Sequence, residues 1–442
     1  MVWFFVVWLP LGFTWGGDFR AGSARVDITP GEPIWMAGFA ARNRPSEGVA
    51  TRLWAKALAV EDGSRGKAVI VTTDLIGLSR NISETVAARV AQQYGLPRSR
   101  LLLNSSHTHS GPVVKANLMT MYFLTPEQQA AVDRYASRLV ENLVTVIGAA
   151  IADLSPARLS VAHGQVGFAM NRRTKFPPGP VDHDVPVLAV RTPDGKLKAV
   201  LFGYACHNTT LLADYVQING DYAGYAQTEV EAAQPGVTAL FLMLCGGDAN
   251  PSPRGTLADA ERHGRTLAAE VLRQLAGPMK PIKPSLRSAW QTIDLAFQPH
   301  SREQFEQEAK SENRYLASRA RAMLRAYDER RPLHRISYPV QAIRLGKDFT
   351  ILALGGEVVA GYGLRAKREF APADLIVAGY SNDVMCYIPT RTIVREGGYE
   401  GADSMIYYGL PGPLTEDVEE TIFQSIRTVL RRIGLKILQT GR

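Results

Sequence analysis

The stretch Leu101–Pro112, LLLNSSHTHSGP, is a short apolar run that passes directly into a polar turn. Consecutive leucines are typical of a strand that is buried on both faces. His107 and His109 are two residues apart, so their rings project to the same side of an extended segment. Paired imidazoles after a strand suit a zinc site. The same turn is also compatible with histidines that only hydrogen-bond to the backbone.

Strand-like runs alternate with helical runs on both sides of this stretch. Strands are predicted at 55–60, 68–73, 101–104, 159–166, 186–191, 199–205, 237–244, 340–345, 350–354 and 375–378, and helices at 82–94, 128–154, 222–233, 257–275, 359–370 and 416–435. No linker rich in Gly, Ser or Pro divides these elements, and no internal repeat is present. We therefore expect an α/β fold in which mixed β-sheets are covered by helices, in a single large catalytic domain.

The segment Ser301–Arg330 is the most polar helical stretch of the chain. A helix of such high charge density does not belong in a core. We expect it to form a surface arm or a lid.

Composition limits the partners of this chain of 442 residues. Its 46% hydrophobic and 21% charged residues are those of an ordinary globular protein. The net charge is +8, but the basic residues do not gather into a block, so we expect no nucleic-acid partner. The cysteines Cys206, Cys245 and Cys386 are far apart, which argues against both a disulfide framework and a thiolate zinc site.

The first residues form an apolar run, MVWFFVVWLPLGFTWG, of signal-peptide length. Pro10 interrupts this run, which is also too short for a membrane span. We expect residues 1–17 to be a signal peptide, residues 18–442 to be the mature domain, and the protein to be secreted or periplasmic. Membrane contact, if present, is expected to be peripheral.

Three further turns carry polar side chains directly after predicted strands, where ligands usually bind in α/β proteins. They are Cys206-His207-Asn208, Gly246-Gly247-Asp248-Ala249-Asn250 and Gly356-Glu357. Paired glycines allow a close backbone approach, and their amides can stabilise an oxyanion. Each turn also has a structural interpretation, such as a tight turn or a carboxylate at a helix start. These residues alone are compatible with a metal-dependent hydrolase and indicate no substrate.

In this order, the turns resemble those of the neutral/alkaline (non-lysosomal) ceramidase family. The similar segments are Val26-Asp27-Ile28-Thr29-Pro30, Met36–Ala40, His107-Thr108-His109-Ser110-Gly111-Pro112, Asn171-Arg172-Arg173, Asp182–Val185, Ala205-Cys206-His207, Gly356-Glu357, and Ser381-Asn382 with Tyr387. The resemblance extends from about Arg25 to Tyr408, nearly the whole predicted mature chain.

The resemblance implies a site with assigned roles. It implies one Zn²⁺ held by His107, His207, Glu357 and Tyr387, with His109 and Arg172 binding the substrate carbonyl or the oxyanion. Gly247 and Asp248 would contact the substrate in the glycine turn. Bound zinc polarises an amide carbonyl and lowers the pKa of water to about 7, which fits amide hydrolysis.

The chain departs from the family pattern in two places. Asn250 stands where the family carries a serine, and a carboxamide is no nucleophile although it donates hydrogen bonds. Asn250 is therefore expected to assist catalysis by zinc-activated water. The chain also stops soon after Leu435, so we expect no C-terminal immunoglobulin-like domain.

The expected function is zinc-dependent cleavage of the N-acyl amide bond of ceramide or a related small amphipathic amide. One alternative keeps the zinc site and changes the substrate to a sugar-linked or other non-lipid amide or ester. A second alternative is a catalytically silent family member that only binds its ligand.

Overall fold

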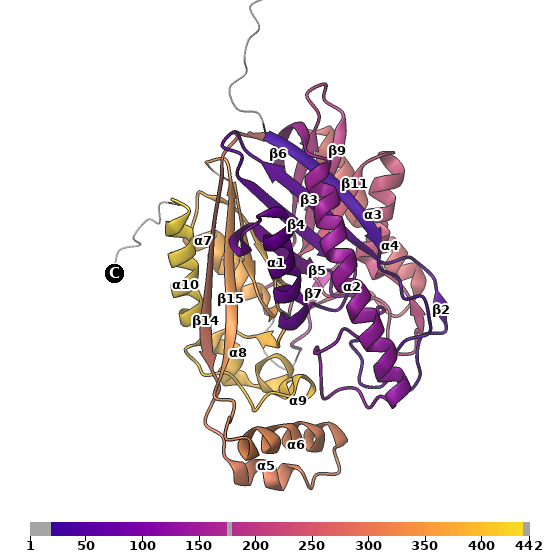
Figure 1. The fold of residues 1–442 in the computed structure, drawn as a ribbon, viewed down its shortest axis with the longest axis vertical. Helices are drawn as coiled ribbons and strands as arrows, with labels where there is room; N and C mark the ends of the chain where they lie inside the picture. The colour runs from indigo at the N-terminus through magenta and orange to yellow at the C-terminus, as the bar shows by residue number, and fades with distance from the viewer. Residues whose placement is uncertain (1–18, 175–178, 348, 436–442) are drawn as a thin grey trace, which may run out of the picture.

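The computed structural model describes residues 19–174, 179–347 and 349–435. The predicted signal peptide, residues 1–17, lies outside the described residues. The remaining chain folds as two packed β-sheets with helices on their outer faces (Figure 1). The expected fold class, mixed sheets covered by helices, is confirmed.

The larger sheet contains nine strands among the described residues, in the order β11-β9-β8-β6-β1-β3-β4-β5, with β13 also paired to β6. Its strands are β1 Phe19–Asp27, β3 Trp54–Glu61, β4 Lys67–Thr73, β5 Leu101–Ser105, β6 Ser155–Gln165, β8 Asp184–Arg191, β9 Leu197–Tyr204, β11 Thr238–Met243 and β13 Lys280–Ile282. The pairs β4–β5 and β9–β11 are parallel, whereas the other pairs are antiparallel. The polar turns that carry His107, His207 and Asp248 begin at the carboxyl ends of the strands β5, β9 and β11.

The smaller sheet has the order β14-β15-β16-β18, with strands β14 Leu286–Ala296, β15 Arg335–Leu345, β16 Phe349–Leu354 and β18 Asp374–Ala378. One face of this sheet packs against the larger sheet. Leu102 and Leu201 from the large sheet share a buried cluster with Ile351 and Ile376 from the small one. Because the inner faces of both sheets are apolar, the two sheets stack around a common core.

Helices cover the outer faces of the two sheets (Figure 1). On the large sheet lie α1 Arg80–Tyr94, α2 Pro126–Ala152, α3 Asp221–Ala233 and α4 Leu257–Ala276, and on the small sheet lie α7 Ala360–Glu369 and α10 Val418–Arg432. Among the described helices, α2 alone is long and apolar enough to span a membrane by length and composition. Its apolar face packs on β1 and β3, as expected for a core helix.

Short elements complete the fold. They are β2 Gly48–Val49 paired with β10 Gln217–Ile218, β7 Ala169–Asn171 paired with β12 Ala249–Pro251, β17 Glu357–Val358 paired with β19 Tyr387–Ile388, the short helices α8 Arg391–Glu396 and α9 Met405–Tyr408, the 3₁₀ turn Arg98–Arg100 and the π-helical turn Tyr399–Asp403. The second and third strand pairs carry candidate site residues.

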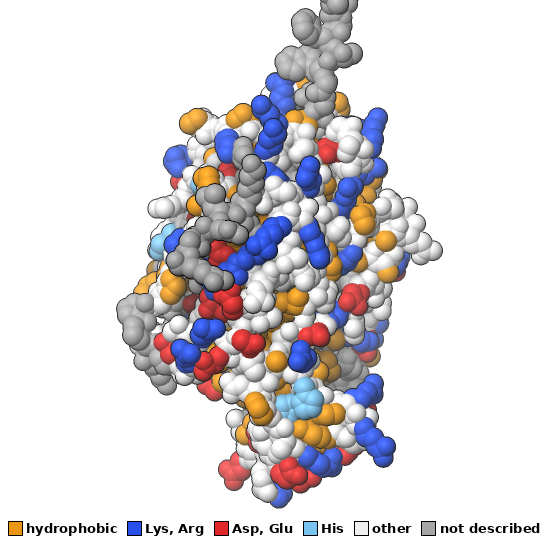
Figure 2. Space-filling model, turned by 90° about the vertical axis from the view of Figure 1, so that its left-hand side faces the viewer, with side chains coloured by type: hydrophobic (Ala, Val, Ile, Leu, Met, Phe, Trp, Pro, Cys, Tyr) orange, Lys and Arg blue, Asp and Glu red, His pale blue; other side chains and the backbone are white. Residues whose placement is uncertain are grey.

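The predicted polar helix 301–330 is two helices, α5 Arg302–Glu308 and α6 Arg314–Asp328. The break has a local cause, because the Asn313 side chain accepts backbone N–H groups of the next turn and so starts a new helix. The two helices project as an arm at the bottom of the view in Figure 1. Basic and acidic side chains lie side by side on this arm in Figure 2. Arg319 fixes it to the body through the carbonyls of Leu410 and Pro411.

Candidate functional site

The four expected metal ligands lie at the strand ends and meet in one place. His107 follows β5 and His207 follows β9, and their turns are joined by a bridge between the next residues along, Thr108 and Asn208. Glu357 and Tyr387 are direct partners in the parallel pair β17–β19. The fold therefore gathers side chains that are as much as 280 residues apart in the chain (387 − 107).

Both histidines are oriented by the backbone. His107 Nδ1 lies 2.5 Å from the carbonyl oxygen of Ile76, and His207 Nδ1 lies 2.9 Å from that of Gly246. A carbonyl only accepts, so Nδ1 carries the hydrogen in each ring and Nε2 holds the lone pair. This arrangement, in which one ring nitrogen is fixed and the other is free to ligate, is typical of metal-binding histidines.

The two Nε2 atoms face one carboxylate oxygen. Glu357 Oε2 lies 3.0 Å from His107 Nε2 and 3.1 Å from His207 Nε2. Tyr387 OH lies 3.1 Å from His207 Nε2. The other carboxylate oxygen, Oε1, accepts the hydroxyl hydrogen of Tyr408. Four candidate ligand atoms thus converge, and Tyr408 orients the carboxylate that carries one of them.

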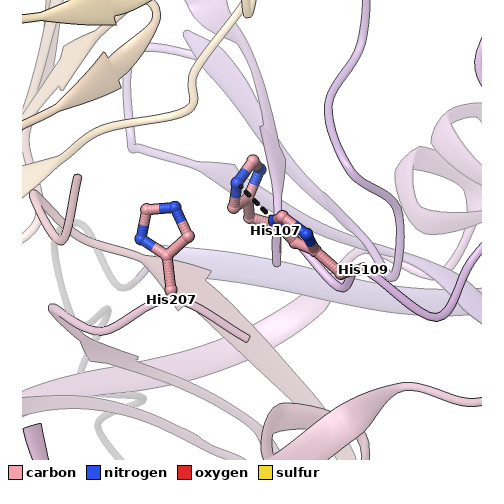
Figure 3. Close-up of side chains that lie close together, drawn as sticks. All are labelled: His107, His109 and His207. Atoms are coloured by element: carbon pink, nitrogen blue, oxygen red, sulfur yellow. Dashed lines mark hydrogen bonds between the residues drawn. The ribbon is translucent and has the colours of Figure 1, made fainter. Parts of the chain in front are cut away.

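His109 is the third imidazole of the cluster (Figure 3). Its Nε2 lies 3.1 Å from His107 Nε2, and one ligand atom from each of His107, His109 and His207 lies within 4.8 Å of the others. His109 Nδ1 is buried and has no hydrogen-bond partner among the described residues. Gly38, with φ of +92°, lies against this ring, where a Cβ would come within 2.3 Å of Nδ1.

The ionisation of these groups suits a metal site. Burial, and then the charge of Arg172, lowers the pKa of His207 to about 4. Burial and the neighbouring histidines lower the pKa of His109 well below its ordinary value. Burial raises the pKa of Glu357, but the interactions with His107 and His207 outweigh it, and the pKa lies well below the ordinary value. Neutral imidazoles and an ionised carboxylate are the forms that ligate metals.

The donor set fits a zinc ion by its chemistry. Two imidazole nitrogens with a carboxylate oxygen are known ligands of catalytic zinc, and a phenol oxygen adds a fourth hard donor. The alternative donor set is the three imidazoles of His107, His109 and His207. Both sets share His107 and His207, so a metal ion at this position has the same two anchors in either case.

Arg172 occupies the other side of the site. Its Nε donates to Glu400 Oε1 at 2.7 Å, its Nη2 donates to Tyr387 OH at 2.9 Å, and its Nη1 lies 3.3 Å from Asn250 Oδ1. The guanidinium also lies 5.4 Å and 5.5 Å from the ring centres of Tyr387 and Tyr399. Burial lowers the pKa of Arg172, but Tyr387 and Glu400 outweigh it and hold the pKa above its ordinary value. Arg172 is therefore charged and fixed.

A cleft of about 560 Å³ opens onto these groups. It is lined by Gly38, Phe39, His109, Arg172, Arg173, Thr174, Thr209, Asn250, Arg254, Tyr387, Gly398, Tyr399, Glu400 and Asp403. The lining combines aromatic rings with charged and neutral polar groups. Four expected site residues, His109, Arg172, Asn250 and Tyr387, reach the cleft, while His107, His207 and Glu357 are buried beside it.

The structure does not bring Gly247 and Asp248 to this cleft. Gly247 N donates to the Val358 carbonyl at 2.8 Å, so its amide is not free for a substrate. Asp248 Oδ1 accepts from Ala360 N at 2.8 Å and Oδ2 from Asn171 Nδ2 at 3.0 Å. Both residues have a structural role next to the site. Gly247 connects the turn after β11 to Val358, which follows Glu357. Asp248 connects the same turn to Ala360 and to Asn171, the residue before Arg172.

Three contributors to the site were not singled out from the sequence. Tyr408 holds Glu357, Glu400 holds Arg172, and Tyr399 packs on Arg172. All three lie in one short segment, GGYEGADSMIYY, which contains two glycines of positive φ and a π-helical turn. Such turns are frequent at functional sites, and this aromatic-rich segment was the available signal.

Comparison with known proteins agrees with the geometry. The family model for the neutral/alkaline non-lysosomal ceramidase N-terminal region matches residues 19–256, more than half of the chain. The neutral ceramidase of Mycobacterium tuberculosis is 23% identical over 463 residues, 84% of this chain and 71% of that protein. The neutral ceramidase of Pseudomonas aeruginosa is 26% identical over 257 residues, 53% of this chain and 37% of that protein.

Solved structures share the fold. A structure described as a ceramidase complexed with C2 covers 96% of this chain and is itself covered to 77%, with a TM-score of 0.74 and 20% identity. The crystal structure of the Pseudomonas aeruginosa neutral ceramidase gives a TM-score of 0.73 at 19% identity, with 96% and 76% covered. The two-sheet architecture described above is thus found in both of these structures.

Proposed function

Because the chain belongs to the neutral/alkaline non-lysosomal ceramidase family, we propose that it is a metal-dependent hydrolase of N-acyl amides. The proposed substrate is ceramide or a related small amphipathic amide, and the proposed metal is Zn²⁺. The observation that carries the proposal is the convergence of His107 Nε2, His207 Nε2 and Glu357 Oε2 beside the cleft. The names of the relatives support ceramide as the first substrate to test.

His107, His207, Glu357 and Tyr387 would hold the ion. When bound, Zn²⁺ supplies Lewis-acid polarisation of the carbonyl and lowers the pKa of water to about 7. The protein's part is to keep the ligands in their binding forms. The two carbonyl contacts at Nδ1 fix the tautomers, and Tyr408 fixes the Glu357 carboxylate.

Arg172 would bind the oxygen on which negative charge develops. A guanidinium has five N–H groups, and Glu400, Tyr387 and Asn250 take one each. The other two N–H groups have no partner among the described residues and could bind a substrate in the cleft that Arg172 lines. A charge that is already fixed requires no reorganisation during the reaction, which is the basis of electrostatic catalysis.

His109 would transfer protons. It lines the cleft, and its imidazole is neutral because burial lowers its pKa. In the reaction, the hydroxyl of water is added to the acyl carbon, the C–N bond breaks, and a proton goes to the amine nitrogen. A neutral imidazole accepts the proton of water and then donates it to the leaving amine.

The cleft has the mixed character that an amphipathic amide needs. Phe39 and Tyr399 offer rings, while Thr209 and Asn250 offer polar groups. Beside the cleft, Met170, which lies opposite Asn250 in the β7–β12 pair, is 57% exposed, and Tyr399 is 40% exposed. These apolar groups favour a substrate with an alkyl chain, and contact with a membrane would be peripheral.

Export belongs to the same proposal. Residues 1–17 would direct the protein to the periplasm or the exterior, and the mature protein would begin at Asp18. Sequencing the N-terminus of protein recovered from the periplasm or medium of a bacterial host tests this proposal. Retention in the cytoplasm with Met1 intact would contradict it.

The test of the function is hydrolysis of a short-chain fluorescent ceramide by the purified protein, with and without a zinc chelator. We expect fatty-acid release that the chelator stops and added Zn²⁺ restores. No release from a folded, zinc-loaded sample would exclude this substrate. A panel of non-lipid amides and esters then separates a different hydrolase from a silent binding protein.

A further inference from the structure

The Asn250 side chain is held in one orientation. Arg172 Nη1 and Thr209 Oγ1 each lie 3.3 Å from Asn250 Oδ1. A guanidinium donates hydrogen bonds and never accepts them. The carboxamide atom that faces Arg172 must therefore be the oxygen, and the amide nitrogen is turned away from both neighbours.

The amide nitrogen of Asn250 remains available. The structure gives Nδ2 no hydrogen-bond partner among the described residues, and the residue lines the cleft. The backbone around it is fixed, since Asn250 pairs with Met170 in the β7–β12 ladder and His207 N donates to the Ala249 carbonyl at 2.9 Å. The cleft thus contains a neutral N–H donor whose position is set before a ligand arrives.

We propose that Asn250 is a catalytic residue, whose Nδ2 donates to the acyl carbonyl oxygen of the bound amide and to the oxyanion that replaces it. The proposal rests on the proposed function and deepens it. Through Arg172, Asn250 is linked to Tyr387 and so to the candidate metal ligands. Arg172 and Asn250 would then act on the same oxygen, one as a charged donor and one as a neutral donor.

Two substitutions separate this role from a purely positioning one. Asn250→Asp keeps an oxygen for Arg172 and Thr209 but has no N–H group. Asn250→Ser shortens the side chain but keeps a donor. If Asn250 only positioned Arg172, the Asp variant would be the better enzyme. If it donates to the substrate, the Ser variant is the better enzyme.

The experiment measures kcat/KM for a short-chain ceramide with the zinc-loaded protein and both variants. We expect Asn250→Asp to lose about 100-fold or more, as for other oxyanion donors, and Asn250→Ser to stay within about tenfold of the unchanged protein. Zinc content and thermal unfolding should not change in either variant. An Asp variant with the unchanged rate would overturn the proposal.

Binding gives a second readout that does not depend on turnover. A urea analogue of the short-chain ceramide keeps the carbonyl oxygen and resists hydrolysis, whereas an N-alkyl analogue lacks this oxygen. We expect Asn250→Asp to weaken binding of the urea roughly threefold to tenfold, as for loss of one hydrogen bond, and not to weaken binding of the N-alkyl analogue, whose protonated amine the new carboxylate attracts.

The two readouts separate the possible failures. If the protein binds the urea but cleaves no ceramide, the proposed function fails, and the comparison of variants still decides the role of Asn250. Equal affinity of the unchanged protein and Asn250→Asp for the urea would overturn the inference. No binding of the urea at all would overturn both proposals.

Discussion

Arg172 touches the candidate metal ligands through Tyr387, whose hydroxyl lies 2.9 Å from Arg172 Nη2, yet the histidines and the arginine are held in different ways. His107 and His207 are anchored by main-chain carbonyls of Ile76 and Gly246, in the turns that follow β4 and β11. Arg172 is held by the side chains of Glu400, Tyr387 and Asn250. A change in one of these side chains moves the guanidinium without disturbing the sheet.

Because the two groups are held differently, substitutions should be able to remove metal binding and stabilisation of the oxyanion separately. Metal binding should depend on the ligands and on Tyr408, whereas charge stabilisation should depend on Arg172, Glu400 and Asn250; Tyr387 contributes to both. The His107 backbone, with φ of +66°, is in a region that non-glycine residues seldom adopt, so the surrounding fold must hold it there. The two histidines are therefore held by main-chain groups, whereas Arg172 is held by side chains that single substitutions can remove.

The largest effect is expected from Glu357→Ala. The change removes the carboxylate oxygen that lies 3.0 Å and 3.1 Å from the two Nε2 atoms. Zinc content and turnover should fall together by more than about 100-fold, since losing an outer contact alone costs 10–100-fold at metal sites. Metal analysis beside a rate measurement checks this prediction. Full zinc content in this variant would exclude Glu357 as a ligand.

Arg172→Ala should leave zinc bound and lower kcat/KM by about 100-fold to 1000-fold, because a charged donor to the oxyanion is lost. Arg172→Lys is the matched control. Lysine keeps the charge but cannot contact Glu400, Tyr387 and Asn250 together, so its rate should lie between the other two. A parallel loss of zinc in Arg172→Ala would mean that metal binding and stabilisation of the oxyanion are not separable.

Tyr408→Phe should weaken metal affinity by about 10-fold to 100-fold, because the hydroxyl hydrogen bond that orients Glu357 is lost. Saturating zinc should restore the rate. The comparison with Glu357→Ala is informative, since that variant should stay inactive at any zinc concentration. Chelator competition measures the affinity, and an unchanged affinity would exclude a role of Tyr408 in metal binding.

The smallest effect concerns stability and lies away from the site, where His163 joins the two sheets. Its Nδ1 lies 3.0 Å from Asp184 on the large sheet, and its Nε2 lies 2.9 Å from Asp374 on the small one. Burial lowers the pKa of His163, but the two carboxylates outweigh it and raise the pKa to about 9.

A group whose pKa is raised in the folded state stabilises the protein fully below its unfolded pKa. That stability is lost as pH rises through the folded pKa. For His163 the loss falls between about pH 6.5 and pH 9. Its size should be about 1–2 kcal/mol after allowance for solvent exposure. Urea unfolding across this range should show the decline, and His163→Gln should flatten it without changing zinc content. An equal decline in both proteins would contradict the assignment.

Much of this site could be predicted from local sequence. Strands that pass into polar turns located His107, His207 and the glycine turn, because the chain must leave a buried strand through groups that water or a ligand satisfies. Glu357 was a ligand candidate from its own turn, as a carboxylate that could complete a zinc set with the two histidines, whereas Tyr387 became one only through the family resemblance. Their pairing in β17–β19 joins two short segments that have no strand-like pattern of their own.

The parts that the sequence did not predict depend on long-range contacts. The strand β14 was missed because only one of its faces is covered, so its apolar residues are sparse. Glu400 and Tyr408 could not be assigned, because their partners Arg172 and Glu357 are 228 and 51 residues away. Asp248 resembled a substrate contact by its place after a strand, but the amides that surround it occupy both of its oxygens.

The most direct test of the central claim is an anomalous difference map at the zinc edge from a zinc-loaded crystal. We predict one peak bonded to His107 Nε2, His207 Nε2, Glu357 Oε2 and Tyr387 OH. A peak held by His107, His109 and His207 that leaves Glu357 unbound would contradict the ligand set. A crystal with no peak in the cluster would contradict the metal-dependent mechanism itself.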